Sequence, residues 1–373
     1  MEAEGYHGVS RVSICGTIGA FIVHVGRDLL PHRNAHLVKA TVVIPTYRRS
    51  ARLRQLLACL VTQRGDALAQ VIVCDDGSGD DTEQVARSFE GTLPLEYRFQ
   101  PDLGFRAGQA RNLGITAARG EVLIFVDDDV LVADDFVREH VEAHRAQPRP
   151  SIVIGYRHRA FTPPRAQPTA SEIATGEPDD RVAVLGSDGT PVRDHPRPWV
   201  YVYSCNFSAR RGSPELLFHE GFSGWGMEDI ELGYRLWRKA GMPIVAAARA
   251  RVLHVEDPAP RDPFRCEERA LAPHYDTYVR NAVYFMDLHP EDSDLADWVR
   301  SDLRWYVCDP SGRFVKNGHA NDVEAVIARC RSDRAARDRA ASERRDGAST
   351  ASATGRPTPT PLDGSYGDQG RTA

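Results

Sequence analysis

The 373 residues include 47 Lys and Arg against 52 Asp and Glu, a formal net charge of −5 that excludes a globally basic nucleic-acid-binding protein. A hydrophobic fraction of 42% and a charged fraction of 27% exclude a fibrous or wholly disordered chain. The seven cysteines form no CxxC pair, which excludes a small disulfide scaffold or zinc ribbon and favours a reducing, cytoplasmic location. No run of 18 apolar residues is present, so no integral membrane segment is expected.

Apolar runs alternate with helical periodicity from Ala40 onward. Buried strands are predicted at 41–45, 71–74 and 122–126, with a further strand at 95–99. Helices are predicted between them at 53–61, 79–89 and 106–118. This alternation predicts an α/β fold in which a parallel sheet is covered by helices on both faces.

The pattern is looser in the second half of the chain. Residues 158–198 are rich in Pro, Asp and Gly and predict a long insertion or mobile loop. Strands are expected at 200–208 and 244–255, and a helix at 227–240. The predicted organisation is an N-terminal extension (1–39), the α/β domain (40–257), a helical region (258–335) and a disordered tail (336–373). Within the tail region, 332–345 is compatible with an exposed helix, but the Ser, Thr, Pro and Gly beyond Gly347 offer little apolar surface to offset ordering entropy.

Polar sequences follow three of the predicted strands: Pro45-Thr46-Tyr47, Asp75-Asp76-Gly77-Ser78 and Asp127-Asp128-Asp129. Ligands of parallel sheets bind beyond the carboxyl ends of the strands, so all three are expected to open onto one crevice. Three adjacent carboxylates repel one another, and a hard cation such as Mg²⁺ or Mn²⁺ would relieve that repulsion. The alternative for both acidic runs is a solvated turn or a helix N-cap, where Asp is also favoured.

The order and spacing of these three runs resemble family 2 glycosyltransferases of the GT-A fold. The resemblance implies a hexosyl- or N-acetylhexosaminyltransferase that uses a nucleotide-diphosphate sugar, with a UDP-sugar as the expected donor. It places the Asp triplet at the family's DxD motif. Asp129 is then the expected direct metal ligand, and Asp127 either faces the ribose or sugar or joins the metal shell.

The same resemblance assigns donor contacts to the other polar runs. It places the base against Pro45, Thr46 and Tyr47, and gives the base contact to Asp75 or Asp76 without choosing between them. Asp128 belongs to the same donor site.

Residues 104–114 open a helix that carries Arg106 and Arg111. A helix N-terminus with arginines nearby suits a phosphate group. The family commonly has an Arg-Asn-x-Gly stretch in this place, lining the donor site, so both arginines are expected donor contacts. The alternative is a surface helix with ordinary arginines.

A second signal runs from Gly221 to Glu231, where Gly-Trp-Gly precedes an acidic pair at the start of a helix. Acids complement a helix dipole, but that explanation leaves the glycines unexplained. The segment resembles the catalytic motif of β-1,4-galactosyltransferases and polypeptide N-acetylgalactosaminyltransferases. By this resemblance Trp225 and Gly226 line the donor site, and Glu228 and Asp229 form the catalytic pair. Inverting enzymes carry two acids here, so Asp229 is the expected base, with a retaining enzyme as the alternative.

His254 follows the acidic pair at the spacing at which related enzymes place a metal-binding histidine; the alternative is a structural histidine. The expected acceptor is a saccharide, a lipid-linked sugar or a small molecule. Segment 221–227, with 158–198, is expected to close over the donor and exclude water. Two other functions stay open. A nucleotidyltransferase would want a Gly-rich phosphate loop where Pro45 to Arg49 has none, and a non-catalytic nucleotide-sugar-binding module would not need the acids.

Overall fold

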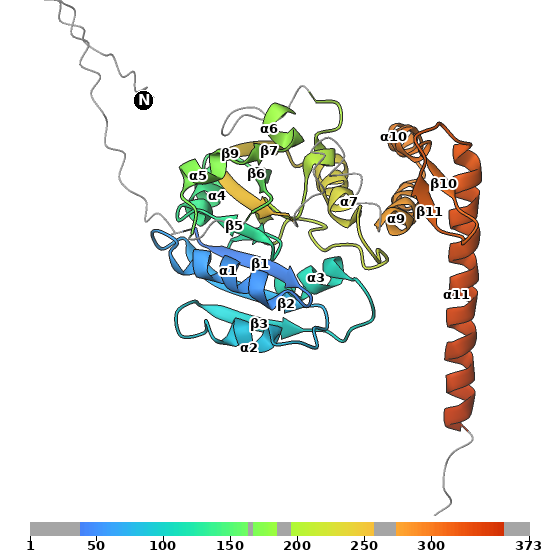
Figure 1. The fold of residues 1–373 in the computed structure, drawn as a ribbon, viewed down its shortest axis with the longest axis horizontal. Coiled ribbons are helices and arrows are strands. Elements are labelled where there is room, and N and C mark those ends of the chain that lie inside the picture. Colours follow the sequence, from blue (N-terminus) through green and yellow to red (C-terminus); the bar gives the residue numbers. More distant parts are fainter. Residues whose placement is uncertain (1–37, 163–166, 185–194, 257–273, 354–373) are drawn as a thin grey trace, which may run out of the picture. The chain divides into compact units, whose positions relative to one another are not determined.

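The computed structural model describes residues 38–162, 167–184, 195–256 and 274–353, so most of the predicted N-terminal extension lies outside the described residues. Within these ranges the chain forms a nine-stranded sheet in the order β3-β2-β1-β4-β8-β6-β9-β5, with β7 paired to β6 (Figure 1). The strands are β1 (Ala40–Thr46), β2 (Leu68–Asp75), β3 (Leu95–Phe99), β4 (Val122–Phe125), β5 (Val130–Val132), β6 (Ile152–Ala160), β7 (Glu177–Pro178), β8 (Phe207–Arg210) and β9 (Ile244–Val255).

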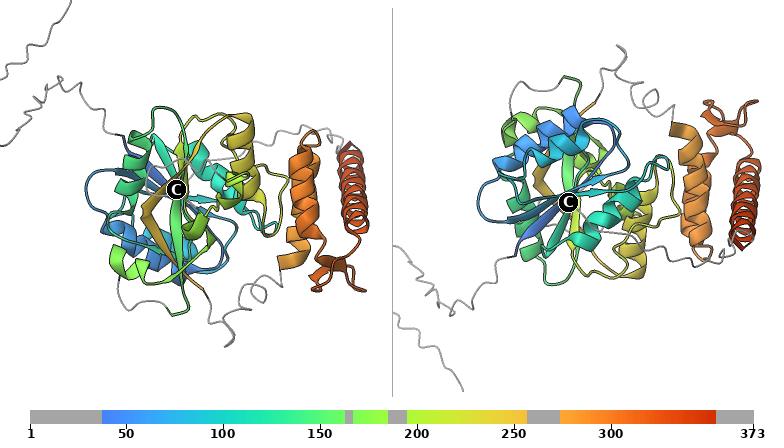
Figure 2. Two further views of the ribbon diagram at one scale, coloured as in Figure 1. Left: turned by 90° about the horizontal axis from the view of Figure 1, so that it is seen from above. Right: turned by 90° about the horizontal axis from the view of Figure 1, so that it is seen from below.

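The first half of the sheet is parallel, because β1 pairs in parallel with both β2 and β4, and β2 with β3. Alternate residues of β1 pack on opposite faces: Val42 joins one hydrophobic cluster and Val43 the other. Helices α1 (Ser50–Val61), α2 (Thr82–Arg87) and α4 (Phe136–Arg145) cover one face, and α3 (Ala107–Ala117) covers the other (Figure 2). Both faces are therefore buried, which confirms the predicted α/β architecture.

The second half of the sheet is mixed. Strand β8 runs antiparallel to β4 and to β6, whereas β6 and β9 are parallel and β5 is antiparallel to β9. The strand predicted at 244–255 is confirmed, but the one predicted at 200–208 is wrong. A 3₁₀ turn η1 (Pro198–Tyr201) takes its place, since Pro198 presets a helical φ and Trp199 is drawn into the core, and β8 begins only at Phe207.

The predicted mobile loop at 158–198 is also largely structured where it is described. Its first residues belong to β6, and it contains α5 (Ala170–Ala174), β7 and α6 (Asp180–Val184). Asp179 and Arg181, both fully buried side chains, form an ion pair at 3.0 Å. Residues 163–166 and 185–194 lie outside the described residues.

The C-terminal region is helical, as predicted, but contains a hairpin that the pattern did not indicate. The predicted helix at 227–240 consists of α7 (Glu228–Tyr234) followed by a π-helical turn η2 (Arg235–Lys239). Beyond it come α9 (Tyr275–Leu288), α10 (Ser293–Leu303), the hairpin β10 (Tyr306–Cys308) and β11 (Phe314–Lys316), and α11 (Val323–Ala353). Residues 336–353, predicted as part of a disordered tail, continue α11, because this stretch is rich in Ala and Arg and free of Pro.

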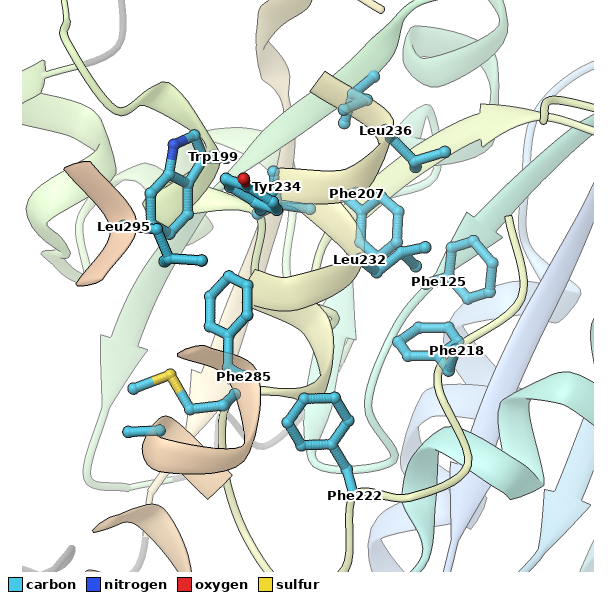
Figure 3. Packing of buried hydrophobic residues seen from close by; sticks show 14 of the residues in the cluster. Phe125, Trp199, Phe207, Phe218, Phe222, Leu232, Tyr234, Leu236, Phe285 and Leu295 are labelled. Carbon is cyan, nitrogen blue, oxygen red and sulfur yellow. The ribbon is translucent and has the colours of Figure 1, made fainter. Parts of the chain in front are cut away.

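An aromatic core fixes the position of α7. Trp199 packs edge-on against Tyr234 of α7 and Phe285 of α9, with ring centroids 5.3 and 5.9 Å away (Figure 3). Phe125 of β4 stacks on Phe207 of β8 at 4.7 Å. Burial of each such side chain contributes about 1.5–3 kcal/mol, so α7 is held against the sheet and against α9. Among the described residues, no helix is both long and apolar enough to cross a membrane.

Two buried histidines connect α4 to β8. His140 lies 2.9 Å from both Ser208 Oγ and Asn206 Oδ1, and His144 Nε2 lies 2.9 Å from the same Ser208 Oγ. Burial lowers the pKa of His140 to about 4 and that of His144 to about 3. Both imidazoles are therefore neutral in the folded protein at physiological pH.

The free energy of unfolding is expected to fall in mild acid because of these histidines. In the folded protein their pKa values lie below the ordinary value of about 6.5. At a pH between the folded and the ordinary values, the unfolded chain therefore binds more protons than the folded protein. The contribution of the two histidines to the free energy of unfolding is complete above about pH 6.5. It is lost as the pH falls toward about 4, at up to ~1.4 kcal/mol per pH unit for each histidine. Urea unfolding across this window should show a shallower pH dependence in His144→Gln than in the wild type. Parallel curves would contradict the assignment.

Candidate active site

The carboxyl ends of β1, β2 and β4 meet, as their polar sequences predict. Thr46 Oγ1 donates a 2.7 Å hydrogen bond to Asp128 Oδ2, and the Asp76 amide donates to the Thr46 carbonyl at 2.9 Å. These contacts join the three polar runs at one edge of the sheet. Tyr47 points to a different partner, since its hydroxyl donates to Asp102 Oδ2 at 2.8 Å.

Asp75 and Asp76 are both buried and both bonded within the protein. Asp75 Oδ1 accepts the amides of Gly77 and Ser78 at 3.0 and 2.7 Å, and its Oδ2 accepts the Tyr97 hydroxyl at 2.6 Å. Asp75 thus shapes the turn after β2, which is one of the two roles that the sequence left open. The backbone needs Gly77 there, because its φ is +96° and a Cβ would overlap the Asp102 backbone.

Asp76 connects β2 to the start of α3. It accepts the side-chain amide of Gln100 and the backbone amide of Arg106, both at 2.6 Å, and burial raises its pKa. The Arg106 guanidinium lies 3.8 Å from Asp76 Oδ1 and donates to Gln109 Oε1 at 3.0 Å. The turn therefore places Arg106 beside the Asp pair.

Asp129 and His254 come from two separate sequence signals and lie in contact. Strands β5 and β9 pair Val130 with His254, which brings His254 Nε2 to 3.2 Å from Asp129 Oδ1. Arg49 Nη1 donates to Asp129 Oδ2 at 2.6 Å. Burial opposes ionisation of Asp129, but the hydrogen bonds and charges of His254 and Arg49 outweigh it and lower the pKa of Asp129 to about 2.

The pKa values of Asp128 and His254 are raised, whereas the pKa of Asp129 is lowered. Burial, reinforced by the charge of Asp129, raises the pKa of Asp128 to about 7. Burial disfavours the imidazolium of His254, but hydrogen bonds to Asp129 and Glu256 raise its pKa to about 9. The carboxylate of Asp129 thus contributes to both rises, by its charge at Asp128 and by a hydrogen bond at His254.

The Asp129 and His254 pair suits a divalent cation. Asp129 Oδ1 and His254 Nδ1 are buried and have only ion-pair contacts, to His254 Nε2 at 3.2 Å and to Glu256 Oε1 at 3.5 Å, and carboxylate oxygen with imidazole nitrogen is a ligand set that Mn²⁺ accepts. In the part of the chain that the structure describes, no group of three or more His, Cys, Asp or Glu is arranged to hold a metal by itself. A cation here would therefore need oxygen ligands from a substrate diphosphate and water.

Arg111 links the acidic triplet to the acidic pair of α7. Its guanidinium is almost wholly buried and donates to Asp127 Oδ1 at 2.8 Å and to Glu228 Oε1 at 3.2 Å. It also lies over the Phe218 ring, 5.3 Å from the centroid. The alternative of an ordinary surface arginine is wrong for Arg111, since the side chain bridges two carboxylates.

The two acids at the start of α7 differ in their partners. Asp229 accepts two backbone amides, that of Ser204 at Oδ2 (2.9 Å) and that of Ile230 at Oδ1 (2.8 Å), whereas Glu228 has Arg111. Burial and the neighbouring Asp229 charge raise the pKa of Glu228 to about 7, and burial also raises the pKa of Asp229. The backbone amides of Ser204 and Ile230 favour the charged form of Asp229 and partly offset this rise in its pKa.

Removal of the Arg111 bridge is expected to destabilise the fold. Arg111→Gln leaves the buried Glu228 carboxylate and the partly exposed Asp127 carboxylate without this cation, and breaking a buried ion pair such as Arg111–Glu228 costs about 3–5 kcal/mol. The matched control is Arg119→Gln, because Arg119 is an exposed arginine paired with Glu96 at 3.3 Å and exposed pairs contribute about 0–1 kcal/mol. Urea unfolding measures both, and equal losses would show that the bridge contributes no more than a surface pair.

The segment 221–227, expected to close over the donor, is packed against α9. Gly224, Gly226 and Met227 have φ values of +75°, +98° and +76°, which explains the glycines that precede the acids. The Trp225 ring stacks on His274 with centroids 5.5 Å apart and lies 5.9 Å from Tyr278. The structure therefore describes a supported loop rather than a free lid.

Sequence reasoning missed three groups of this site: Arg49, Ser204 and the side chains of α9. Arg49 could have been recognised from the sequence, because it is a basic residue that directly follows the polar end of the first strand. In the structure it is paired with Asp129 of the acidic triplet. The Ser204 amide and the α9 side chains could not be recognised from sequence, because long-range packing alone brings the amide to Asp229 and the α9 side chains to the loop before the acidic pair.

The sheet order is that of the GT-A fold, and the matches that follow support a GT-A, family 2-like glycosyltransferase. The chain matches the family model of glycosyl transferase family 2 over residues 41–206. It resembles the crystal structure of S. aureus TarS in complex with UDP-GlcNAc, with a TM-score of 0.51 and 15% identity over 71% of this chain and 72% of that one.

Two curated relatives carry glycosyltransferase names. Validoxylamine A glucosyltransferase of Streptomyces hygroscopicus subsp. jinggangensis is 34% identical over 242 residues, covering 58% of this chain and 56% of that protein. The protein named uncharacterized glycosyltransferase YfnE of Bacillus subtilis is 27% identical over 311 residues, covering 72% and 78%. The chain thus spans only about half the length of the Streptomyces relative.

Proposed function

We propose that this chain is a metal-dependent, inverting glycosyltransferase that moves a hexosyl or N-acetylhexosaminyl group from a UDP-sugar to an acceptor hydroxyl. The observation that carries this proposal is the Arg111 bridge. It brings Asp127, in the acidic triplet, next to Glu228, in the acidic pair. The acidic run whose Asp129 would hold the donor diphosphate through a metal, and the acidic pair whose Asp229 would accept the proton, are thereby adjacent, as transfer between two substrates requires.

In the proposed mechanism, Asp229 takes the proton from the acceptor hydroxyl as general base. The amides of Ser204 and Ile230 orient its carboxylate and leave lone pairs free for that proton. The acceptor oxygen then attacks the anomeric carbon in a single displacement, which inverts its configuration. Asp129 and His254 would hold Mn²⁺ or Mg²⁺, with Asp127 beside them, and a bound cation would neutralise the charge on the departing nucleotide diphosphate.

The donor contacts in this proposal follow the positions of the side chains. Asp76 and Arg106 lie together at the end of β2, and Thr46 contacts Asp128 at the end of β1. We assign the nucleotide to this edge. The name of the Streptomyces relative, a glucosyltransferase of validoxylamine A, supports a hexosyl donor and adds weight to a small-molecule acceptor.

A panel of nucleotide sugars tests the proposal. UDP-glucose, UDP-N-acetylglucosamine, UDP-galactose, UDP-N-acetylgalactosamine and GDP-mannose are each incubated with Mn²⁺ or Mg²⁺, and release of the nucleoside diphosphate is measured. We expect metal-dependent hydrolysis of a UDP-sugar, abolished by EDTA, with NMR showing an inverted anomeric centre in the first-formed sugar. Retention of the anomeric configuration would indicate the retaining alternative. Formation of a nucleoside triphosphate from the nucleotide sugar and pyrophosphate would indicate a nucleotidyltransferase. Binding of the donor without turnover would indicate a non-catalytic module.

A further inference from the structure

The glycine-rich segment before the catalytic pair, residues 221–227, is shaped by side chains of α9. A Cβ on Gly221 would overlap the Tyr284 hydroxyl, and a Cβ on Gly224 would overlap the Thr277 methyl group. At Gly226 a Cβ would lie 3.0 Å from Cδ2 of Tyr278. Three glycines of one loop thus each admit a different side chain of the same helix.

Hydrogen bonds from α9 hold the loop backbone in this position. Asn281 is buried, and its Nδ2 donates to the carbonyls of Ser223 at 3.1 Å and Gly226 at 2.9 Å. Thr277 Oγ1 accepts the Trp225 amide at 3.0 Å. Thr277, Asn281 and Tyr284 recur at the spacing of one helix face, so this face of α9 is fitted to the loop.

The restraint reaches the catalytic pair through very few residues. Gly226 leads to Met227, whose left-handed backbone (φ +76°) caps α7, and Glu228 and Asp229 follow directly. A rotation of the loop at Gly226 would therefore move the Asp229 carboxylate away from the Ser204 amide that it accepts.

The other end of α7 is tied to the same helical region. The side chain of His289, which follows α9, lies 3.2 Å from Glu231 Oε1, and the Tyr234 hydroxyl donates to Asp292 Oδ2 at 2.8 Å. Tyr234 and Phe285 also pack together in the aromatic core (Figure 3). Helix α9 thus supports α7 at its far end as well as through the loop that precedes it.

We propose that Asn281 and Thr277 are positioning residues of the transfer reaction, which hold segment 221–227 in the conformation that presents Asp229 to the acceptor. Helix α9 is then part of the active centre, although it lies beyond residues 41–206 that match the family model. This inference rests on the proposed function. It differs from a purely structural role, because it requires the rate of the chemical step to depend on these two side chains while donor binding does not.

The test compares Asn281→Ala and Thr277→Ala with a control on the same helix, Arg280→Gln. Arg280 donates to Asp333 of α11 at 2.7 Å and to the Gly312 carbonyl at 3.2 Å, so its loss removes contacts of α9 with the C-terminal region and leaves the hydrogen bonds of Asn281 and Thr277 to the loop in place. We expect kcat of Asn281→Ala and Thr277→Ala to fall by about 10- to 100-fold, because small misplacements of a catalytic group have effects of this size. The Kd of both variants for UDP with Mn²⁺ should stay within about threefold of the wild-type value, because the substitutions change the placement of Asp229 and not the contacts that bind the donor. The control should keep its kcat, and Thr277→Ser, which retains the hydroxyl, should recover most of the rate.

Hydrogen–deuterium exchange of the amides in 221–227 separates this inference from the proposed function. Exchange should accelerate in Asn281→Ala, because the carbonyls of Ser223 and Gly226 lose their donor, and should remain slow in Arg280→Gln. Unchanged exchange in Asn281→Ala, or faster exchange with an unaltered kcat, would overturn the positioning role. A wild-type protein that turns over no donor would instead overturn the proposed function, whatever the exchange result.

Discussion

Replacement of Asp229 by Asn is expected to lower the rate of sugar transfer by about 10²–10⁴-fold, the range that a positioned general base contributes. Asn is isosteric with Asp, and its carbonyl oxygen can still accept one of the two amides, from Ser204 or Ile230, that hold the native carboxylate. Donor binding should therefore be retained while transfer is lost. Burial raises the pKa of Asp229, so the wild-type rate should fall as the pH drops and protonates it, and this acid limb should be absent from the residual rate of the variant.

Two further variants make this result decisive. Asp294→Asn removes a carboxylate that is paired with Arg197 at the protein surface and should turn over normally. Glu228→Gln tests the other acid of the pair. Near-normal turnover of Asp229→Asn, combined with loss of turnover in Glu228→Gln, would transfer the role of base to Glu228.

Replacement of Asp129 by Ala is expected to abolish Mn²⁺-dependent binding of UDP. The substitution removes the carboxylate that lies 3.2 Å from His254, and a single imidazole with a diphosphate is a poor ligand set for a hard cation. Calorimetric titration of the wild type with UDP should give binding with Mn²⁺ and little with EDTA. The variant should resemble the EDTA sample under both conditions.

A neighbouring acid provides the matched control for the metal site. Asp134→Ala removes one negative charge from the same region, but Asp134 is paired with Arg64 outside the site, at 2.5 Å. It should bind UDP as the wild type does. Equal binding in Asp129→Ala with and without Mn²⁺, at wild-type strength, would remove the metal assignment and leave Arg49 as the counter-charge of the diphosphate.

The parallel half of the sheet could be predicted from the sequence, whereas much of the mixed half could not. Val42 to Ile44 and Val122 to Val126 are short apolar runs rich in β-branched residues, which is typical of a strand buried on both faces, so the local pattern was enough. Strand β5 (Val130–Val132) is too short to stand out after the Asp triplet, and the hairpin β10–β11 lacks a long alternating run. The error at 200–208 arose because Trp199 and its neighbours are apolar in any conformation, and tertiary packing selected a 3₁₀ turn.

The candidate site shows the same division between local and long-range information. Asp129 and His254 were paired in the prediction by resemblance alone, and the antiparallel register of β5 with β9 accounts physically for their contact. The partners of Arg111 could not be predicted, because Asp127 and Glu228 reach it from different elements. A charged side chain in a sequence does not reveal which opposite charge it will meet.

The sequence by itself determined the class of fold and the strand ends that carry the acids. It also showed that a small net charge of −5 is compatible with a local concentration of acidic residues. Burial and periodicity are encoded locally, and this is why those features could be predicted. Only the tertiary structure decided that Arg111 and Arg49 neutralise the carboxylates, and that α9 supports the glycine-rich loop. These features depend on which distant segments close against one another, and that closure is selected by the packing free energy of the whole chain rather than by any short run of residues.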